Sequence, residues 1–110
     1  MRVLVLLGLA GKASLSKIQS LEKEEAAQVW SLYERGELLE IYISKPKGTA
    51  VLLLEVESVE QARAIVGDLP MVAAGQLEPD CYPLSAWPEM ENLLKAKGLP
   101  TPEWMKGLNG

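Results

Sequence analysis

The sequence EAAQVWSLYERGELLEIYIS, residues 25–44, determines how the rest of the chain is interpreted. Its first twelve residues repeat apolar side chains at helical spacing, and Gly36 ends that repeat, as is typical of the residue that follows a helix. The residues after Gly36 alternate at period two, which predicts a strand over 38–44 with a core face made of Leu39, Ile41 and Ile43. A helix, its stop and a strand therefore follow one another directly.

Residues 2–9 are apolar almost throughout, which is typical of a strand that is covered on both faces. The pattern then breaks at residues 10–13, and Ser14 or Ser16 can cap the helix that follows. Ser16 begins a Ser-x-x-Gln capping box, and a helix start at Ser20 is the alternative. The first helix is thus predicted to run from this region to the stop at residue 36.

Residues 45–48, KPKG, form a turn that leads into a strand over 49–56, so the two strands should be an antiparallel hairpin. A second capping box begins at Ser58 and opens a helix that ends at Gly67 and Pro70. These elements predict a second helix that is shorter than the first.

A fourth strand is predicted to begin over residues 71–74, to bulge at Gly75 and to resume through Leu77. A further extended segment over 81–84 contains Pro83, so it should lie at a sheet edge or outside the sheet. These residues complete the predicted sheet.

The predicted order is strand, helix, strand, strand, helix, strand, which is that of an α+β ferredoxin-like plait (βαββαβ). Such a plait has an antiparallel four-stranded sheet with two helices on one face, and we expect it over residues 1–85. Residues 86–110 add a C-terminal helix and an apolar tail, which should pack on the domain or on its partner. Because the first and third strands are apolar on both sides, a second copy of the sheet should cover the open face in a homodimer. The tail helix is the alternative cover.

The composition indicates one compact domain of 110 residues with 48% hydrophobic residues. Its formal charge is −4, which disfavours nucleic acid and anionic membranes as partners. Cys81 is the single cysteine, so no intrachain disulfide can form and a cytoplasmic location is expected. The apolar start of the chain is too short for the usual export signal, and no stretch reaches the length of a membrane-spanning helix.

The chain contains no histidine, which removes Ser-His-Asp and Cys-His catalysis and histidine-ligated zinc or haem. No cofactor and no metal are expected, which agrees with the family resemblance described below. Any chemistry should use carboxylates, tyrosines, lysines or arginines.

Five segments resemble the muconolactone isomerase-like family of dimeric α/β barrels. They are EAA at 25–27 with Leu32, Tyr33 and Gly36, GTAVLLLE at 48–55, SVEQA at 58–62, LPMVAAG at 69–75 and YPL at 82–84. The resemblance implies a ferredoxin-like plait that dimerises, with a cavity between sheet and helices or between sheets. It also implies a cofactor-independent isomerase that moves a proton on an unsaturated lactone. The branch of the family that uses a histidine-aspartate pair does not fit this sequence.

Three glutamates are candidates for the proton-transferring group, because a carboxylate removed from water has a raised pKa. Glu25 lies in the family-like pattern, Glu40 shares a strand face with Tyr42, whose hydroxyl could donate to an oxyanion, and Glu55 is flanked by apolar residues. We predict Glu25 or Glu40 as the base with Tyr42 as the donor. Each glutamate also has a structural interpretation, as a helix-start acid, a cross-strand partner or a strand-end residue.

Aromatic side chains could form the wall of an apolar pocket. With Glu55, the candidates for substrate binding are Trp30, Tyr33 and Tyr82, although aromatic residues at helical spacing are also typical of a core. Two functions stay open. One is an isomerase or related proton-transfer enzyme acting on a small unsaturated carbonyl or lactone compound, and the other is a non-catalytic module that binds a small apolar ligand or a protein.

Overall fold

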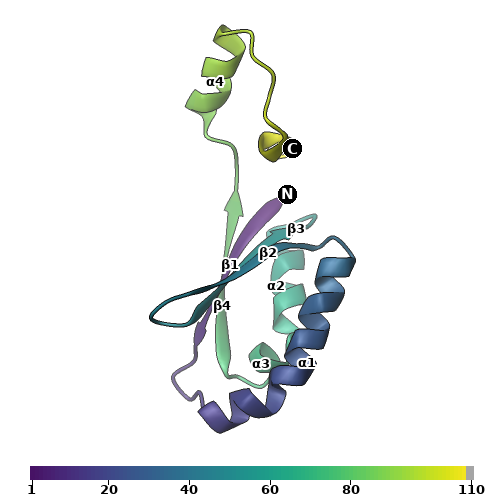
Figure 1. Ribbon diagram of the computed structural model, residues 1–110, viewed down its shortest axis with the longest axis vertical. Coiled ribbons are helices and arrows are strands. Elements are labelled where there is room, and N and C mark those ends of the chain that lie inside the picture. The colour runs from purple at the N-terminus through teal and green to yellow at the C-terminus, as the bar shows by residue number, and fades with distance from the viewer. Residues whose placement is uncertain (109–110) are drawn as a thin grey trace.

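The computed structural model describes residues 1–108, which form four strands, four helices and one short 3-10 helix. The strands pair in the order β2-β3-β1-β4, and every neighbouring pair is antiparallel, so the predicted α+β ferredoxin-like fold is confirmed (Figure 1). The elements in chain order are β1 (Arg2–Leu9), α1 (Leu15–Glu34), β2 (Leu38–Ser44), β3 (Thr49–Glu55), α2 (Val59–Gly67), α3 (Pro70–Ala73), β4 (Leu77–Leu84), α4 (Pro88–Ala96) and η1 (Glu103–Met105).

Serine side chains begin both long helices of the plait. Ser14 caps α1, where its hydroxyl accepts from the N–H of Lys17 at 3.4 Å, so the alternative starts at Ser16 and Ser20 are wrong. Ser58 caps α2, where its hydroxyl accepts from the N–H of Gln61 at 3.0 Å, as the capping box predicts. At the far end of α1, Gly36 has φ +78° and stops the helix as predicted.

The residues predicted to begin the fourth strand form the short helix α3 instead. Pro70 occupies the first turn of α3, where its fixed φ suits a helix and its missing N–H is not needed. Gly75 has φ +73° and ends α3, so β4 begins only at Leu77. The strand then includes the segment around Pro83, which is tolerated because β4 is an edge strand.

A β-bulge corrects the predicted core face of β2. Leu38 pairs with Leu54 and Glu40 pairs with Leu53, so Leu39 has no partner of its own. Leu38 is consequently buried in the core at 2% exposure. The other two residues predicted as core are exposed, with Ile41 at 44% and Ile43 at 59%. Their exposure follows from their position on an edge strand that α1 covers only in part.

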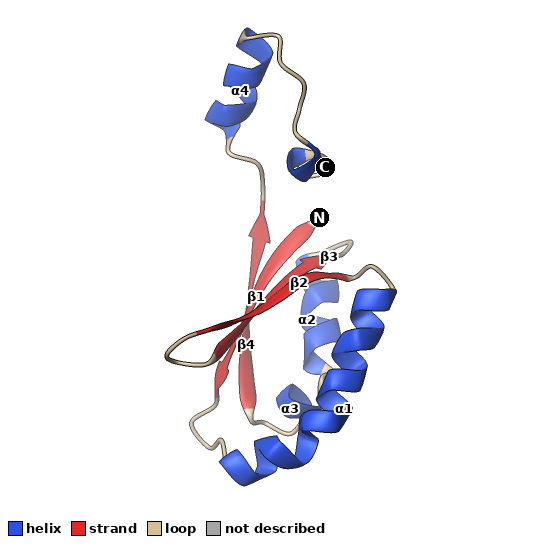
Figure 2. Cartoon of the chain, in the orientation of Figure 1, coloured by secondary structure: helices blue, strands red, loops and turns tan. Residues whose placement is uncertain are grey.

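The hydrophobic core lies between the sheet and the helices α1, α2 and α3, all on one face (Figure 2). Alternate residues of β1 and β3 point into this core, and the residues between them point to the opposite face. We call this second side the open face. Its apolar side chains are paired across the strands and are half-buried or exposed, namely Leu4, Leu6, Tyr42, Val51, Leu53, Tyr82 and Leu84.

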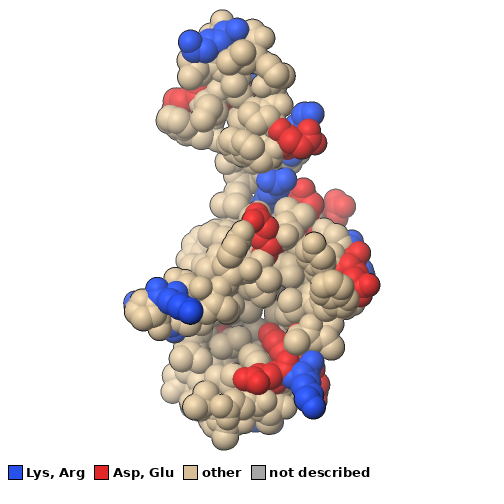
Figure 3. All heavy atoms as spheres, viewed as in Figure 1, with Lys and Arg blue, Asp and Glu red and all other residues tan. Residues whose placement is uncertain are grey.

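Residues 85–108, which contain α4 and η1, form an arm that extends beyond the sheet (Figure 1). The molecule measures 55 Å along its longest axis and 28 and 21 Å along the others. In Figure 3 the arm is a separate lobe that joins the body through a narrow neck. None of the helices in residues 1–108 is long and apolar enough to cross a membrane.

Candidate functional site

A cavity of about 290 Å³ lies between α1 and the helix-covered face of the sheet, with α3 at one side. Its wall contains a single ionisable side chain, that of Glu25. The other lining residues are apolar or glycine and come from α1, α3, all four strands and the turn before β3, namely Leu7, Leu9, Ile18, Val29, Ile41, Ile43, Gly48, Ala50, Leu52, Met71 and Leu77. The volume is near the lower limit for small-molecule sites.

Glu25 is held in this wall by one backbone hydrogen bond. Its Oε1 accepts from the N–H of Met71 at 2.9 Å, which joins the middle of α1 to α3. No residue of the described chain donates to the other carboxylate oxygen, Oε2. One oxygen is therefore fixed in position, while the other is available to a bound molecule.

Partial burial raises the pKa of Glu25 above its usual 4.5, and the hydrogen bond from Met71 opposes this effect to a smaller extent. A carboxyl group with a raised pKa is both a stronger base when ionised and a proton donor closer to neutral pH. The burial that gives Glu25 this property is the same burial that places it in the cavity wall.

A second hollow of about 350 Å³ adjoins the cavity between α1 and β2. Its lining is apolar and aromatic, and it shares Val29 and Ile41 with the cavity. Trp30 and Tyr33 lie at its wall with ring centroids 5.5 Å apart and an interplanar angle of 31°. Together with Ala26 and Leu38, these side chains extend the apolar surface from the cavity toward the solvent.

Small residues leave this space open. Gly48 and Ala50 present little side-chain volume from the β2–β3 hairpin, and Ala26 does the same from α1. The side chains of Ile41 and Ile43 point toward this space and are not covered by the helix. The cavity and the adjoining hollow therefore share one apolar surface along α1 and β2.

Glu40 and Tyr42 lie on the open face, so the sheet separates them from Glu25. The hydroxyl of Tyr42 donates a hydrogen bond to Oε1 of Glu40, and both side chains are exposed. This hydrogen bond is the main cause of a raised pKa of Tyr42, and the negative charge of Glu40 adds to it. The structure thus brings the predicted donor close to Glu40 and not to Glu25.

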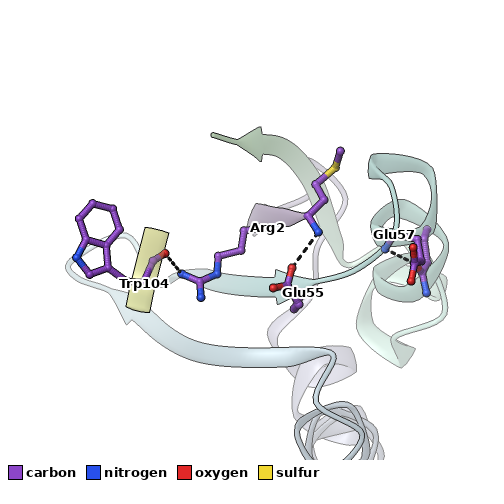
Figure 4. Close-up of polar contacts among 6 residues, drawn as sticks. Arg2, Glu55, Glu57 and Trp104 are labelled. Carbon is purple, nitrogen blue, oxygen red and sulfur yellow. Dashed lines mark hydrogen bonds and ion pairs between the residues drawn. The ribbon is translucent and has the colours of Figure 1, made fainter. Parts of the chain in front are cut away.

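The other two predicted binding residues also lie away from the cavity. Tyr82 stands on the open face beside Leu4. The carboxylate of Glu55 forms an ion pair of 3.0 Å with the N-terminal amino group of Met1 at the end of the sheet (Figure 4). Of the seven predicted site residues, only Glu25, Trp30 and Tyr33 line the cavity or its adjoining hollow.

Met71 is the residue of the candidate site that the sequence does not predict. The sequence pattern places it in a strand, in which its N–H would pair with a neighbouring strand. Pro70 and Gly75 are the sequence features that indicate the helix α3, because proline often occupies the first turn of a helix and glycine often follows its end. Within a helix as short as α3, the N–H of Met71 has no helical partner, so it is free to bind Glu25.

Comparisons with known proteins support the fold. The chain resembles the solved structure of 5-chloro-2-hydroxyhydroquinone dehydrochlorinase from Burkholderia phenoliruptrix AC1100, in its complex with 2,5-dihydroxybenzoquinone. The match has a TM-score of 0.55 and 13% sequence identity and covers 79% of this chain and 97% of that one. No protein-family model matches the chain, and no curated protein matches it in sequence. At this identity the likeness shows a common fold of the ferredoxin-like type and leaves the reaction open.

Proposed function

We propose that this protein is a small-molecule enzyme that transfers a proton without a cofactor, with Glu25 as the proton-transferring group. The observation that carries the proposal is the position of Glu25. It is the single ionisable side chain in the wall of an apolar cavity, with one oxygen bound by Met71 and a pKa raised by burial. Glu40, the alternative base, is an exposed residue outside this cavity.

The reaction that fits one such carboxylate is the isomerisation of an unsaturated carbonyl or lactone compound. Ionised Glu25 takes a proton from the carbon next to the carbonyl, and the C–H electron pair moves into a dienolate. Protonated Glu25 then returns that proton to another carbon of the conjugated system, so the double bond shifts and no atom is gained or lost. A single residue serves as base and then as acid, which a raised pKa favours in both directions.

The lining favours an uncharged ring compound as the substrate. Neither the cavity nor the adjoining hollow has a lysine or arginine in its wall, so an anionic group would face Glu25 without a counter-charge. The apolar walls and the Trp30–Tyr33 pair suit a flat apolar or conjugated ring. The neighbour's name and its bound 2,5-dihydroxybenzoquinone show that one protein of this fold acts on a small oxygenated ring, which is consistent with this class.

The test is a screen of neutral enones and unsaturated lactones by proton exchange in D₂O, followed by NMR. We expect Glu25→Gln to lower the rate on the best compound by roughly 10²-fold or more, since it keeps the acceptor for Met71 but removes the base. Glu40→Gln is the matched control and should keep the wild-type rate, because it removes an exposed carboxylate outside the cavity. Equal rates in wild type and Glu25→Gln would overturn the proposal.

A non-catalytic binding module is the second candidate. The observation in its favour is that none of the residues lining the cavity itself, other than Glu25, has a polar side chain, so no side-chain donor in that wall faces a developing oxyanion. This candidate predicts that cavity ligands bind with micromolar affinity and that their protons do not exchange faster than in buffer. Accelerated exchange that depends on Glu25 would exclude it.

We also propose a homodimer in which the open faces of two sheets pack together. The open face has a continuous apolar centre, because Leu4 lies opposite Leu53 and Tyr82, while Leu6 lies opposite Val51. Burial of such a face against a second copy would remove it from water in a symmetric contact. Light scattering should give twice the 12.0 kDa of one chain, and Leu53→Glu should give one chain mass. A wild-type protein of one chain mass at micromolar concentration would exclude this dimer.

A further inference from the structure

The arm, residues 85–108, is too small to be stable without packing against something larger. Its helix α4 has nine residues, and helices shorter than about 12–15 residues are marginal in water by themselves. Two residues of the arm are buried, Met105 at 3% and Ala86 at 4% exposure. Neither belongs to the core cluster of the plait, and the arm extends away from the sheet (Figure 1).

The outer surface of the arm is unusually apolar. Trp87 is 63% exposed and Trp104 is 53% exposed, and Leu93 and Leu99 are exposed to a similar degree. Tryptophan and leucine side chains that share one small lobe are typical of a surface that binds another protein. The described arm has two tryptophans at such positions, and tryptophan is among the residues that contribute most to interfaces.

The solvent-accessible surface area of the chain supports this interpretation and indicates how much area a partner could cover. The chain exposes 7284 Å², whereas a compact monomer of this mass exposes about 6,000 Å². The excess is about 1,300 Å² per chain, which exceeds the roughly 800 Å² that each partner buries in an interface of standard size. A second copy that covered the open face and the arm together would account for the excess.

The arm is continuous with the open face. Arg2 pairs with Leu84 and Glu55 on that face, and its Nη1 donates to the carbonyl oxygen of Trp104 at 2.9 Å (Figure 4). A hollow of about 570 Å³ lies where the arm joins the body, with Leu84 and Leu108 in its wall. The arm is thus joined to the end of the open face through Arg2 and through the residues that line this hollow.

A buried polar atom lies at this junction. The Nε atom of Arg2 is buried, and no residue in the described part of the chain accepts its hydrogen. An unpaired buried donor of this kind costs free energy. Arg2 thus lies at the end of the open face and holds the arm there through its Nη1 atom.

The arm is about as long as the share of this chain that the structural match leaves uncovered. Its 24 residues are about a fifth of the 110, and the dehydrochlorinase match leaves a similar share of this chain uncovered. The plait does not require the arm for its own core, since neither the buried core residues nor the partly buried residues packed against them lie in the described arm. The arm is therefore an addition to the plait.

We propose that the arm binds a second copy of this chain, so that two copies exchange arms across a two-fold axis. The proposal rests on the homodimer proposed above. Trp104 and the exposed side of α4 pack on the partner next to its open face, and the partner's arm does the same in return. A second copy is the occupant because the arm is continuous with the open face, and the excess area is larger than the area that each partner buries in an interface of standard size.

The test measures the dimer dissociation constant by analytical ultracentrifugation. The double variant with Leu93→Lys and Trp104→Ala should weaken the dimer roughly ten-fold or more, because it removes exposed apolar area from the arm. The control is Leu15→Lys at the start of α1, where Leu15 is 71% exposed and far from the arm. This control should leave the constant unchanged, and the far-UV circular dichroism of both variants should match wild type.

Hydrogen exchange provides a second measurement that does not depend on changes in the arm. The amides of α4 should exchange roughly ten-fold or more slowly in the wild-type dimer than in the Leu53→Glu monomer. Equal exchange in the two, or an arm variant with the wild-type dissociation constant, would overturn the arm proposal while leaving the sheet dimer intact. A monomeric wild type would overturn both, and neither result bears on proton transfer by Glu25.

Discussion

The N–H of Met71 and Oε1 of Glu25 lie 2.9 Å apart and connect two residues separated by 46 positions in the chain. This bond orients a carboxylate that burial alone would leave free to turn. It also joins α1 to α3 at the side of the cavity, so the helix that carries Glu25 and the helix that fixes its carboxylate are held together. The geometry of the candidate site therefore depends on α3, the shortest α-helix of the fold.

Glu25→Gln should make the protein more stable at neutral pH. Burial raises the pKa of Glu25 in the folded state, so ionised Glu25 destabilises the folded protein. Below the unfolded pKa of 4.5 the group is protonated in both states, and this destabilisation is absent. The contribution of Glu25 to stability is thus greatest at low pH and falls as the pH rises through the raised pKa. The gain in Glu25→Gln should be present at pH 7 and vanish near pH 4, as measured by urea unfolding.

Glu24→Gln is the control for this measurement, since Glu24 is the preceding residue of the same helix and is exposed. It makes the same change in charge without relieving burial. If both variants follow the same pH dependence, the burial of Glu25 has no energetic consequence.

Leu38→Ala should destabilise the protein far more than Leu39→Ala. Leu38 is 2% exposed and belongs to the core, so its truncation should cost about 2–5 kcal/mol. Leu39 is half-buried at the bulge and should cost about 1 kcal/mol or less. Chemical unfolding of the two variants measures the difference, and a larger loss in Leu39→Ala would mean that the strand has no bulge.

The sequence predicted the fold well where local signals and hydrophobic patterns agreed. Ser58, Gly36 and the apolar strands gave the element order and hence the antiparallel sheet. The bulge at Leu39 was missed because a one-residue insertion reverses which side chains point inward, and strict alternation cannot reveal it. The residues of α3 were missed because four residues are too few to show helical periodicity.

Only part of the candidate site could be predicted, because its residues come from distant parts of the chain. Glu25 is separated from Met71 by 46 positions, and no local pattern reports a contact over that distance. Glu40 and Tyr42 were correctly assigned to one strand face, and the hydrogen bond between them confirms their proximity. Which side of the sheet the cavity occupies depends on how α1 packs, which a strand pattern does not contain.

Gly36→Ala should cost about 1 kcal/mol of stability. Gly36 has φ +78°, a conformation that an alanine adopts only with strain, although no atom lies within 4 Å of an added Cβ. A loss of this size corresponds to a fall in melting temperature of about 3–5 °C for a domain of this length. Gly11→Ala is the matched control, because Gly11 is equally open but its φ is not positive, and its melting temperature should stay within about 2 °C of wild type.

Glu40→Gln should lower the pKa of Tyr42. The Glu40 carboxylate accepts the hydrogen bond of the phenol and its charge opposes the phenolate, so both effects keep Tyr42 protonated in the wild type. Ultraviolet titration at the phenolate band follows the three tyrosines together, and the change should be confined to the one removed by Tyr42→Phe. Titration curves that coincide in wild type and Glu40→Gln would contradict the hydrogen bond.

Trp30→Ala should weaken ligand binding much more than it weakens folding. Trp30 is 59% exposed at the wall of the hollow next to the cavity, so truncation should cost about 1 kcal/mol of stability or less. Affinity for an apolar ring compound should fall roughly ten-fold, as measured by calorimetry. Trp87→Ala removes a tryptophan of similar exposure from the arm and should leave this affinity unchanged. Equal losses of affinity in Trp30→Ala and Trp87→Ala would mean that the ligand does not bind in the hollow beside Trp30.

The four-stranded sheet has the cavity on one face and an apolar open face, continuous with the arm, on the other. Side chains at alternate positions of β1 and β3 belong to different faces, so a single substitution changes one face and leaves the other in place. Substitutions that reshape the cavity can therefore accumulate independently of substitutions that alter the open face.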